Sequence, residues 1–194
     1  MEPTIYKPSI YKGAGVYKAG AEGGGGGVGP LIIDGQEYGV IEHQVLYGPK
    51  ISLITSDLQL QAGTSGVDYV KLGNRYYYHN RGNVDKIINA MLPDGYKVMT
   101  YDIAEYIKDS ATYWCSQYAF DGKGKNEYGG NFLQNGYLDY RKNVVINGQN
   151  SYIGTLGANV SRIHYFYDNG SVILGSISEL SGDFYFPVRV FKEL

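Results

Sequence analysis

The sequence predicts an α+β fold for residues 30–194, preceded by an extended, glycine-rich N-terminal arm over residues 1–29. Short β-prone segments separated by turn residues fill both ends of the longer region. Two segments with apolar residues at helical spacing lie between them. Strands and helices grouped along the chain in this way are typical of helices packed against one side of an antiparallel sheet.

The arm combines a glycine run, Gly23 to Gly27, with three repeats of a hydrophobe-Tyr-Lys triplet. Glycine-rich sequence loses much backbone entropy on ordering and has little side-chain surface to bury in return. We interpret residues 1–29 as a docking arm with a linker, and the alternative is a disordered tail. The residues expected to dock are Ile5, Tyr6, Lys7, Ile10, Tyr11, Lys12, Val16, Tyr17 and Lys18.

The first part of the domain is rich in β-prone residues. Residues 31–47 predict two short strands around a turn at Asp34-Gly35, and residues 50–60 predict another strand. A polar loop is expected over residues 61–68. Residues 69–78 contain two β-prone pieces around the Gly73-Asn74 turn.

The two helices are expected at residues 83–92 and 101–109. In the first, Asn83 can cap the helix, and Ile87, Ile88 and Met91 lie at helical spacing before the stop at residues 93–95 (PDG). In the second, Thr100 is the expected N-cap, and Ile103, Ile107 and Tyr106 are the residues expected to face inward.

A long irregular loop is expected over residues 120–136, which contain five glycines and three asparagines. Loops of this length in small domains usually carry function. From residue 137 to 191 the chain resembles a series of short strands, and residues 165–167 and 171–174 form the clearest hairpin. The last strand is expected over residues 185–191, with Pro187 at an edge or bulge.

Composition excludes several classes of protein. The net charge is −2 with acids and bases mixed, whereas a nucleic-acid surface requires a basic stripe. No apolar run approaches the ~20 residues of a membrane span, and we expect no secretory signal because the N-terminus lacks an apolar segment. The single cysteine, Cys115, excludes an internal disulfide.

Tyrosine is strongly enriched, with 21 residues against 6 Phe and 1 Trp. Its ring offers a large rigid face with a polar tip, so binding surfaces use it often. Tyrosine also favours strand positions, which is the alternative explanation. We therefore expect some tyrosines on a binding face.

Several short motifs occur in the order found in one family. Residues 31–42 (LIIDGQEYGVIE) resemble the opening IGxQxWMxEN of the Fibrobacter succinogenes major paralogous domain, and residues 73–78 (GNRYYY) resemble its GxxYxW step. Residues 93–100 (PDGYKVMT), with Glu105, resemble PxGWRLPTxxEW. Residues 152–155 (YIGT) lie where that family has YWSST, and residues 186–191 (FPVRVF) resemble its last strand, VRPVR.

This resemblance covers about residues 30–191, with tyrosine in place of most signature tryptophans. It implies a C-type-lectin-like fold, which formylglycine-generating enzymes and the variable proteins of diversity-generating retroelements share. In those variable proteins the C-terminal strands and loops carry the ligand. The arm is similar to proteins encoded by phages of gut Bacteroidales.

We expect no enzymatic activity, no cofactor and no metal. The formylglycine-generating relatives use a cysteine-based copper site, whereas Cys115 alone is interpreted as a small buried hydrophobe. The three histidines lack metal spacing, and the calcium-binding tripeptides of lectins are absent from the domain. Asp102 and Glu105 are interpreted as solvated helix acids rather than as a glycosidase pair.

A binding face is expected on the C-terminal strands and loops. Its residues mix planar rings with adaptable hydrogen-bonding groups, which suits a sugar or a protein epitope. Alternation along each strand is expected to direct some of these side chains into the core. The candidates are Tyr137, Tyr140, Thr155, Asn159, Ser161, Arg162, His164, Tyr165, Tyr167, Asp168, Asn169, Ser176, Ser178 and Glu179.

The function expected from these features is that of a phage virion protein, in a tail or head fibre. The arm would dock to other virion proteins, and the lectin-like head would bind a glycan or protein on the bacterial surface. Such a protein is assembled in the host cytoplasm and acts outside it, and a homotrimer is expected by analogy with fibre tips. The alternatives are a purely structural virion decoration or collar protein and a bacterial surface adhesin.

Overall fold

The computed structural model describes residues 29–60, 67–79, 84–108, 110–116, 124–133, 136–145, 150–155, 162–168, 172–177 and 184–194. The three triplets of the arm lie outside these ranges. Within them the chain combines helices with antiparallel sheets, so the predicted α+β class is confirmed. The helices are α1 (Val84–Met91), α2 (Tyr101–Lys108) and α3 (Ala111–Trp114).

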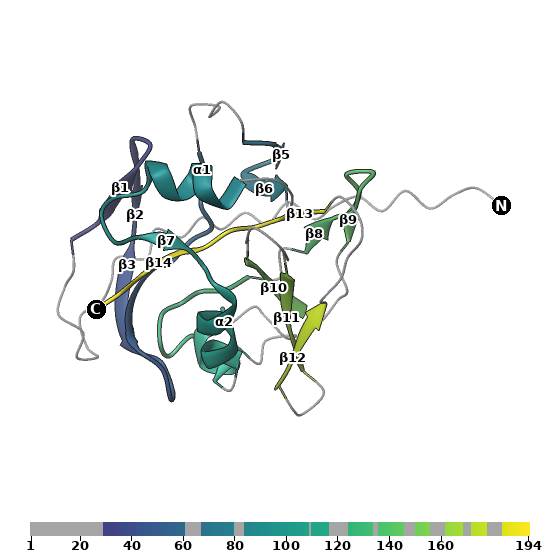
Figure 1. Cartoon of the computed structure of the whole chain (residues 1–194). Coiled ribbons are helices and arrows are strands. Elements are labelled where there is room, and N and C mark those ends of the chain that lie inside the picture. The colour runs from purple at the N-terminus through teal and green to yellow at the C-terminus, as the bar shows by residue number, and fades with distance from the viewer. Residues whose placement is uncertain are drawn as a thin grey trace.

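A four-stranded antiparallel sheet lies at the centre of the described chain (Figure 1). The last strand of the protein lies inside this sheet, where Phe191 pairs with Leu53 on one side and Lys97 on the other. The end of the chain therefore joins segments from its first and middle thirds. In spatial order the strands are β3 (Val40–Gln44), β4 (Lys50–Ile54), β14 (Val190–Glu193) and β7 (Lys97–Val98).

Helices α1 and α2 pack against opposite faces of this sheet. Phe191 belongs to the buried cluster that contains Ile103 of α2, whereas its neighbour Val190 belongs to the cluster that contains Ile88 of α1. Successive residues of a strand point to opposite faces, which explains the division. The expectation that both helices lie on one side is therefore wrong. Helical spacing identifies a buried face, but it does not identify the sheet surface that covers it.

The two expected helices are confirmed with slightly shorter bounds. Ile103 and Ile107 are fully buried, and Tyr106 packs against the same cluster from a partly buried position. The carbonyl of Thr100 accepts the first intrahelical bond, from the Ala104 nitrogen at 3.1 Å, as an N-cap residue does. Asn83 lies outside the described residues, and the short helix α3 was not predicted.

A second, five-stranded sheet adjoins the first. The predicted pair of strands around Gly73-Asn74 is present at its edge, and Gly73 has a positive φ of 59°. Glycine adopts this conformation without a steric penalty, so it suits the turn. In spatial order the strands are β5 (Tyr69–Leu72), β6 (Arg75–His79), β13 (Tyr185–Phe186), β8 (Tyr137–Leu138) and β9 (Val144–Val145).

Two smaller sheets complete the described fold. The predicted hairpin of the C-terminal region is confirmed, because β11 and β12 pair antiparallel with Asp168 opposite Val172. Its turn, residues 169–171, lies outside the described residues. The strands are β10 (Asn150–Thr155), β11 (Arg162–Asp168) and β12 (Val172–Ile177) in one sheet, and β1 (Leu31–Ile33) and β2 (Gln36–Tyr38) in the other.

Residues 31–47 form three strands rather than the two expected. The turn at Asp34-Gly35 joins β1 and β2 as predicted, and the chain then leaves that pair at Gly39 to enter the central sheet as β3. The Gly39 carbonyl accepts a hydrogen bond from the Thr55 nitrogen at 2.9 Å. A Cβ on Gly39 would lie 2.8 Å from the Thr55 Oγ1, so a larger residue here would require the Thr55 side chain to shift.

The last predicted strand, residues 185–191, is divided into β13 and β14. Neither part is an edge strand: β13 lies between β6 and β8, and β14 lies between β4 and β7. Pro187, expected at an edge or bulge, lies where the chain passes from one sheet to the other. Proline lacks the N–H that a ladder requires, so this interruption is a suitable place for it.

The strand predicted over residues 50–60 ends at Ile54. Beyond it, tyrosine hydroxyls make hydrogen bonds with backbone groups that a neighbouring strand would otherwise bind. The Tyr78 hydroxyl accepts a hydrogen bond from the Leu60 nitrogen and donates one to the Leu58 carbonyl, both at 3.1 Å. The Tyr38 hydroxyl accepts from the Gln59 nitrogen at 2.9 Å and donates to its carbonyl at 3.0 Å. Burial raises the pKa of Tyr38 and of Tyr78.

The substitution Tyr78→Phe tests this arrangement. Tyr78 is fully buried, so removal of its hydroxyl leaves the Leu60 nitrogen and the Leu58 carbonyl without this partner. We expect the free energy of unfolding to fall by about 1–3 kcal/mol, measured by urea denaturation. The matched control is Tyr140→Phe at an exposed position, which should change it by less than about 0.5 kcal/mol. Equal effects of the two variants would contradict the assignment.

Candidate functional site

The structure describes nine of the fourteen predicted binding residues. Tyr137 lies on β8 and Tyr140 follows that strand, while the others belong to the backbone of β10, β11 and β12. The remaining predictions, Asn159, Ser161, Asn169, Ser178 and Glu179, lie outside the described residues.

The register of β10, β11 and β12 groups the predicted strand residues into rows. Arg162 pairs with Thr155, and His164 pairs with Ser176 on the far side of β11. Successive residues of a strand belong to opposite faces of a sheet. Arg162, His164 and Asp168 therefore share one face of β11, and Tyr165 and Tyr167 belong to the other.

The three-stranded sheet lies beside the five-stranded one, because β10 contacts β13 (Figure 1). Strand β8 pairs with β13 and continues into a hairpin with β9. The predicted residues of β8 and those of β10 to β12 therefore come from neighbouring parts of the molecule.

Asp139 organises the turn of the β8–β9 hairpin. Its carboxylate accepts hydrogen bonds from the backbone nitrogens of Arg141 and Asn143 at 2.9 and 2.8 Å. Desolvation raises the pKa of Asp139, but the hydrogen bonds from Asn143 and Arg141 outweigh it, so the pKa lies below its ordinary value. Lys142 adopts a positive φ of 63° in this turn. The carboxylate thus stays ionised and holds the turn in one conformation.

The same turn presents an aromatic ring with two cations, and we call residues 140–142 the hairpin tip. Tyr140 is 59 % exposed, and the Arg141 guanidinium lies 5.1 Å from the centre of its ring. The Lys142 Nζ lies 5.7 Å from the ring centre of Tyr185. Tyr137, by contrast, is half-buried against Phe184 and Phe186. The tip can stack on a planar or apolar ligand and attract a negative charge.

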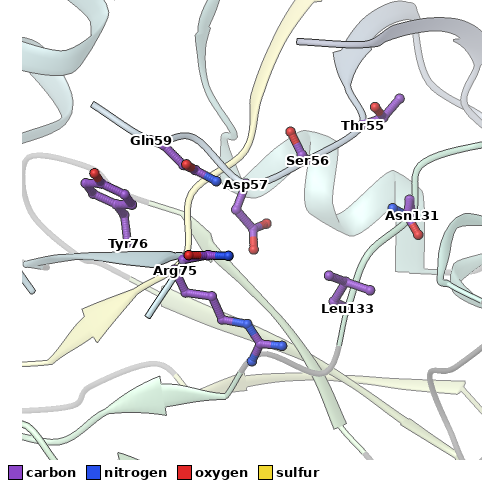
Figure 2. A pocket seen from close by; sticks show the side chains of 9 residues that line it. Thr55, Ser56, Asp57, Gln59, Arg75, Tyr76, Asn131 and Leu133 are labelled. Carbon is purple, nitrogen blue, oxygen red and sulfur yellow. The ribbon is translucent and has the colours of Figure 1, made fainter. Parts of the chain in front are cut away.

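A cavity of about 210 Å³ opens at a different place, and sequence reasoning missed it. Figure 2 shows Tyr76 and Gln59 on one side of it, Asn131 and Leu133 on the other, and the Asp57 carboxylate between them. The only prior signal was the glycine-rich loop of residues 120–136, which contributes two of these residues. The lining consists of Thr55, Ser56, Asp57, Gln59, Asn74, Arg75, Tyr76, Asn131 and Leu133.

Arg189 holds two walls of this cavity in place, the segment that contains Asp57 and the glycine-rich loop. Its side chain is 2 % exposed, and its Nε donates to the Asp57 carboxylate at 2.7 Å. The guanidinium also donates to the carbonyls of Ile54, Gly130 and Asn131 at 2.9 to 3.1 Å. A buried guanidinium is stable only when its N–H groups find such partners. The position of Asp57 is therefore coupled to that of the glycine-rich loop.

His43 and Cys115 pack against other side chains of the fold rather than lining the cavity. The His43 ring stacks on Tyr128 with 4.0 Å between ring centres and meets Trp114 edge-on at 5.1 Å, and burial lowers the pKa of His43. Cys115 is fully buried, as expected. Within the described ranges no group of three or more His, Cys, Asp or Glu side chains is placed to hold a metal ion.

Comparisons of the chain with protein-family models, with curated proteins and with solved structures found no match. No helix in the described ranges has the length and apolar character needed to span a bilayer.

The substitution Arg189→Met tests the role of the buried guanidinium. It leaves the Asp57 carboxylate, which is largely buried, without its ion-pair partner, together with three carbonyls. We expect a loss of about 3–5 kcal/mol in the free energy of unfolding, measured by urea denaturation. Adding Asp57→Asn to Arg189→Met should recover part of this loss, because the carboxylate that has lost the Arg189 guanidinium is then replaced by a neutral amide.

The control is Arg141→Met at the exposed hairpin tip, which should change the free energy of unfolding by less than about 0.5 kcal/mol. A loss below about 1 kcal/mol for Arg189→Met would show that water or other groups satisfy Asp57, and would contradict this assignment.

Proposed function

We propose that the chain is a phage virion protein, part of a tail or head fibre, that adheres to a bacterial surface. In this proposal residues 1–29 dock to other virion proteins, and residues 30–194 form a C-type-lectin-like head that binds a surface glycan or protein. The protein acts in the assembled particle outside the cell, as a homotrimer, without catalysis.

The described fold supports the lectin-like part of the proposal through two of the motifs that carry the resemblance. Residues 93–100 comprise a turn at Gly95, strand β7 and the N-cap residue that precedes α2. Residues 186–191 lead from β13 into β14 and include the buried Arg189. The two motifs meet in the central sheet, where Val98 pairs with Val190. Two motifs that pair with each other in the core depend on each other for their packing. Both are therefore expected in domains that share this fold.

The exposed hairpin tip is the observation that carries the adhesion part. Tyr140 is 59 % exposed, so a partner that covers its ring would remove apolar surface from water. Arg141 beside this ring, and Lys142 over the ring of Tyr185, favour partners that carry negative charge or planar groups. Asp139 holds the turn in place, so the tip would not have to order itself on binding.

The arm supports the docking part through its sequence. Three short hydrophobe-Tyr-Lys segments, separated by a few residues, are suited to adding as strands to the sheet edges of neighbouring virion proteins. A glycine-rich linker after them lets the head move relative to the particle.

Adhesion is tested with the double variant Tyr140→Ala/Arg141→Ala. Fluorescently labelled full-length protein is incubated with a panel of gut Bacteroidales, and cell-bound protein is measured on the strain that the native chain binds best. We expect affinity to fall at least about tenfold, which corresponds to ~1.4 kcal/mol. The matched control is Tyr47→Ala, since Tyr47 is 85 % exposed on the turn between β3 and β4, whereas the hairpin tip lies between β8 and β9.

Equal binding of the double variant and the control would show that the hairpin tip is not part of the adhesive surface. Absence of binding by the native chain to every strain, together with its stable incorporation into particles, would favour the structural decoration protein instead.

The docking arm is tested by hydrogen exchange and limited proteolysis of the purified chain, alone and in assembled particles. We expect residues 1–29 to exchange and be cleaved freely in the isolated protein and to be protected in the particle. The domain from residue 30 onward serves as the internal control, because its strands should be protected in both samples. Protection of the arm in the isolated protein would contradict docking to another component.

A further inference from the structure

The cavity beside Arg189 contains none of the residues assigned to the adhesive face, and it is a site of a different kind. We propose that it binds one ring of an uncharged sugar. This inference goes beyond the proposed function, since it concerns a separate site and does not depend on where the protein acts.

The size of the cavity suits a single ring. Its volume is about 210 Å³. An engineered cavity of about 150 Å³ is large enough for benzene, whereas pockets for drug-sized ligands have about 300–1,000 Å³. The cavity therefore accommodates one six-membered ring with its substituents, and a longer chain would have to extend into solvent.

Most of the lining residues carry polar side chains whose amides match hydroxyl groups, while most of the surface that faces the cavity is apolar. Eight of the nine lining residues carry a polar side chain, and Leu133 is the exception. Within the part of the chain that the structure describes, the side-chain amides of Gln59, Asn74 and Asn131 make no hydrogen bond. Gln59 and Asn131 are half-buried, and polar groups in such positions are normally satisfied by water or a ligand. Each amide offers donors and an acceptor, as a sugar hydroxyl does.

The charges around the cavity favour a neutral ligand. The Asp57 carboxylate is paired with Arg189 at 2.7 Å, so the charge inside the cavity is compensated before any ligand enters. The paired carboxylate can still accept hydrogen bonds from hydroxyl groups. The exposed Arg75 at the rim adds a guanidinium, whose N–H groups also donate to hydroxyl oxygens.

The walls are held in position before binding. Asn131 adopts a positive φ of 50°, and its backbone nitrogen donates to the Asn126 Oδ1 at 2.8 Å. Its carbonyl accepts from the Arg189 guanidinium at 2.9 Å. The opposite wall is tied to the Tyr38 hydroxyl through the backbone of Gln59. A site fixed on both sides loses little conformational entropy when a ligand binds.

The backbone of Asn131 also provides a clean variant. Glycine adopts a positive φ without strain, so Asn131→Gly removes the amide and preserves the loop. Gln59→Met removes a second amide with little change in shape, and its backbone bonds to Tyr38 remain. The matched control is Gln44→Met on the exposed end of β3, outside the cavity.

The experiment is an NMR titration of the full-length chain with a panel of free neutral monosaccharides and, separately, with acidic ones. We expect at least one neutral sugar to shift the amide signals of Gln59, Asn74 and Asn131, with a Kd on the order of 1 mM, the affinity that a few net hydrogen bonds supply. Gln59→Met and Asn131→Gly should each weaken it at least about tenfold, and Gln44→Met should not change it.

Absence of any shift at sugar concentrations about tenfold above that Kd would overturn the proposal. Binding of acidic sugars alone, or binding that survives both cavity variants, would overturn it as well. The outcome is separable from adhesion to cells, because the cavity variants leave the hairpin tip intact and the tip variants leave the cavity intact.

Discussion

The buried guanidinium of Arg189 is the interaction on which the arrangement of the described fold depends. It joins the residue before β14 to Asp57, in the segment after β4, and to the carbonyls of Gly130 and Asn131 in the glycine-rich loop. Neither segment has regular secondary structure where it meets Arg189. A charged group in this position stays buried only while all of its partners are present, so it couples three remote segments into one arrangement. The latter two segments form two walls of the cavity, and residues 74–76 form the third.

The helices could be predicted from the sequence, whereas the assembly of the strands could not. Ile103 and Ile107 lie one turn apart, and that spacing is a local signal. The route of residues 185–191 through two sheets depends on Tyr78, Leu53 and Val98, which are 90 or more positions away in the chain. A β-prone pattern identifies extended backbone, but it does not identify the partner, so two strands were expected to be one.

The high tyrosine content predicted that some tyrosines lie on a binding face, but it did not indicate which tyrosines are exposed and which are buried. Tyr76, Tyr77 and Tyr78 are consecutive and all buried, because both faces of β6 are covered. Tyr78 further provides hydrogen bonds for a backbone segment that has left its sheet. Tyr140 is exposed at the hairpin tip. The role of each ring is set by what lies over it, and that is a tertiary property.

The glycine-rich loop shows why the candidate site was predicted only in part. Its composition indicated function, and two of its residues do line the cavity. The glycines, however, serve close packing first: a Cβ on Gly130 would lie 2.8 Å from the Trp114 Cε3. Because the loop can lie against Trp114, the carbonyls of Gly130 and Asn131 reach Arg189, and the Asn131 amide comes to face Asp57 across the cavity. Cavity residues from three separate segments share no sequence pattern, so the site arises from the packing of the loop rather than from a motif.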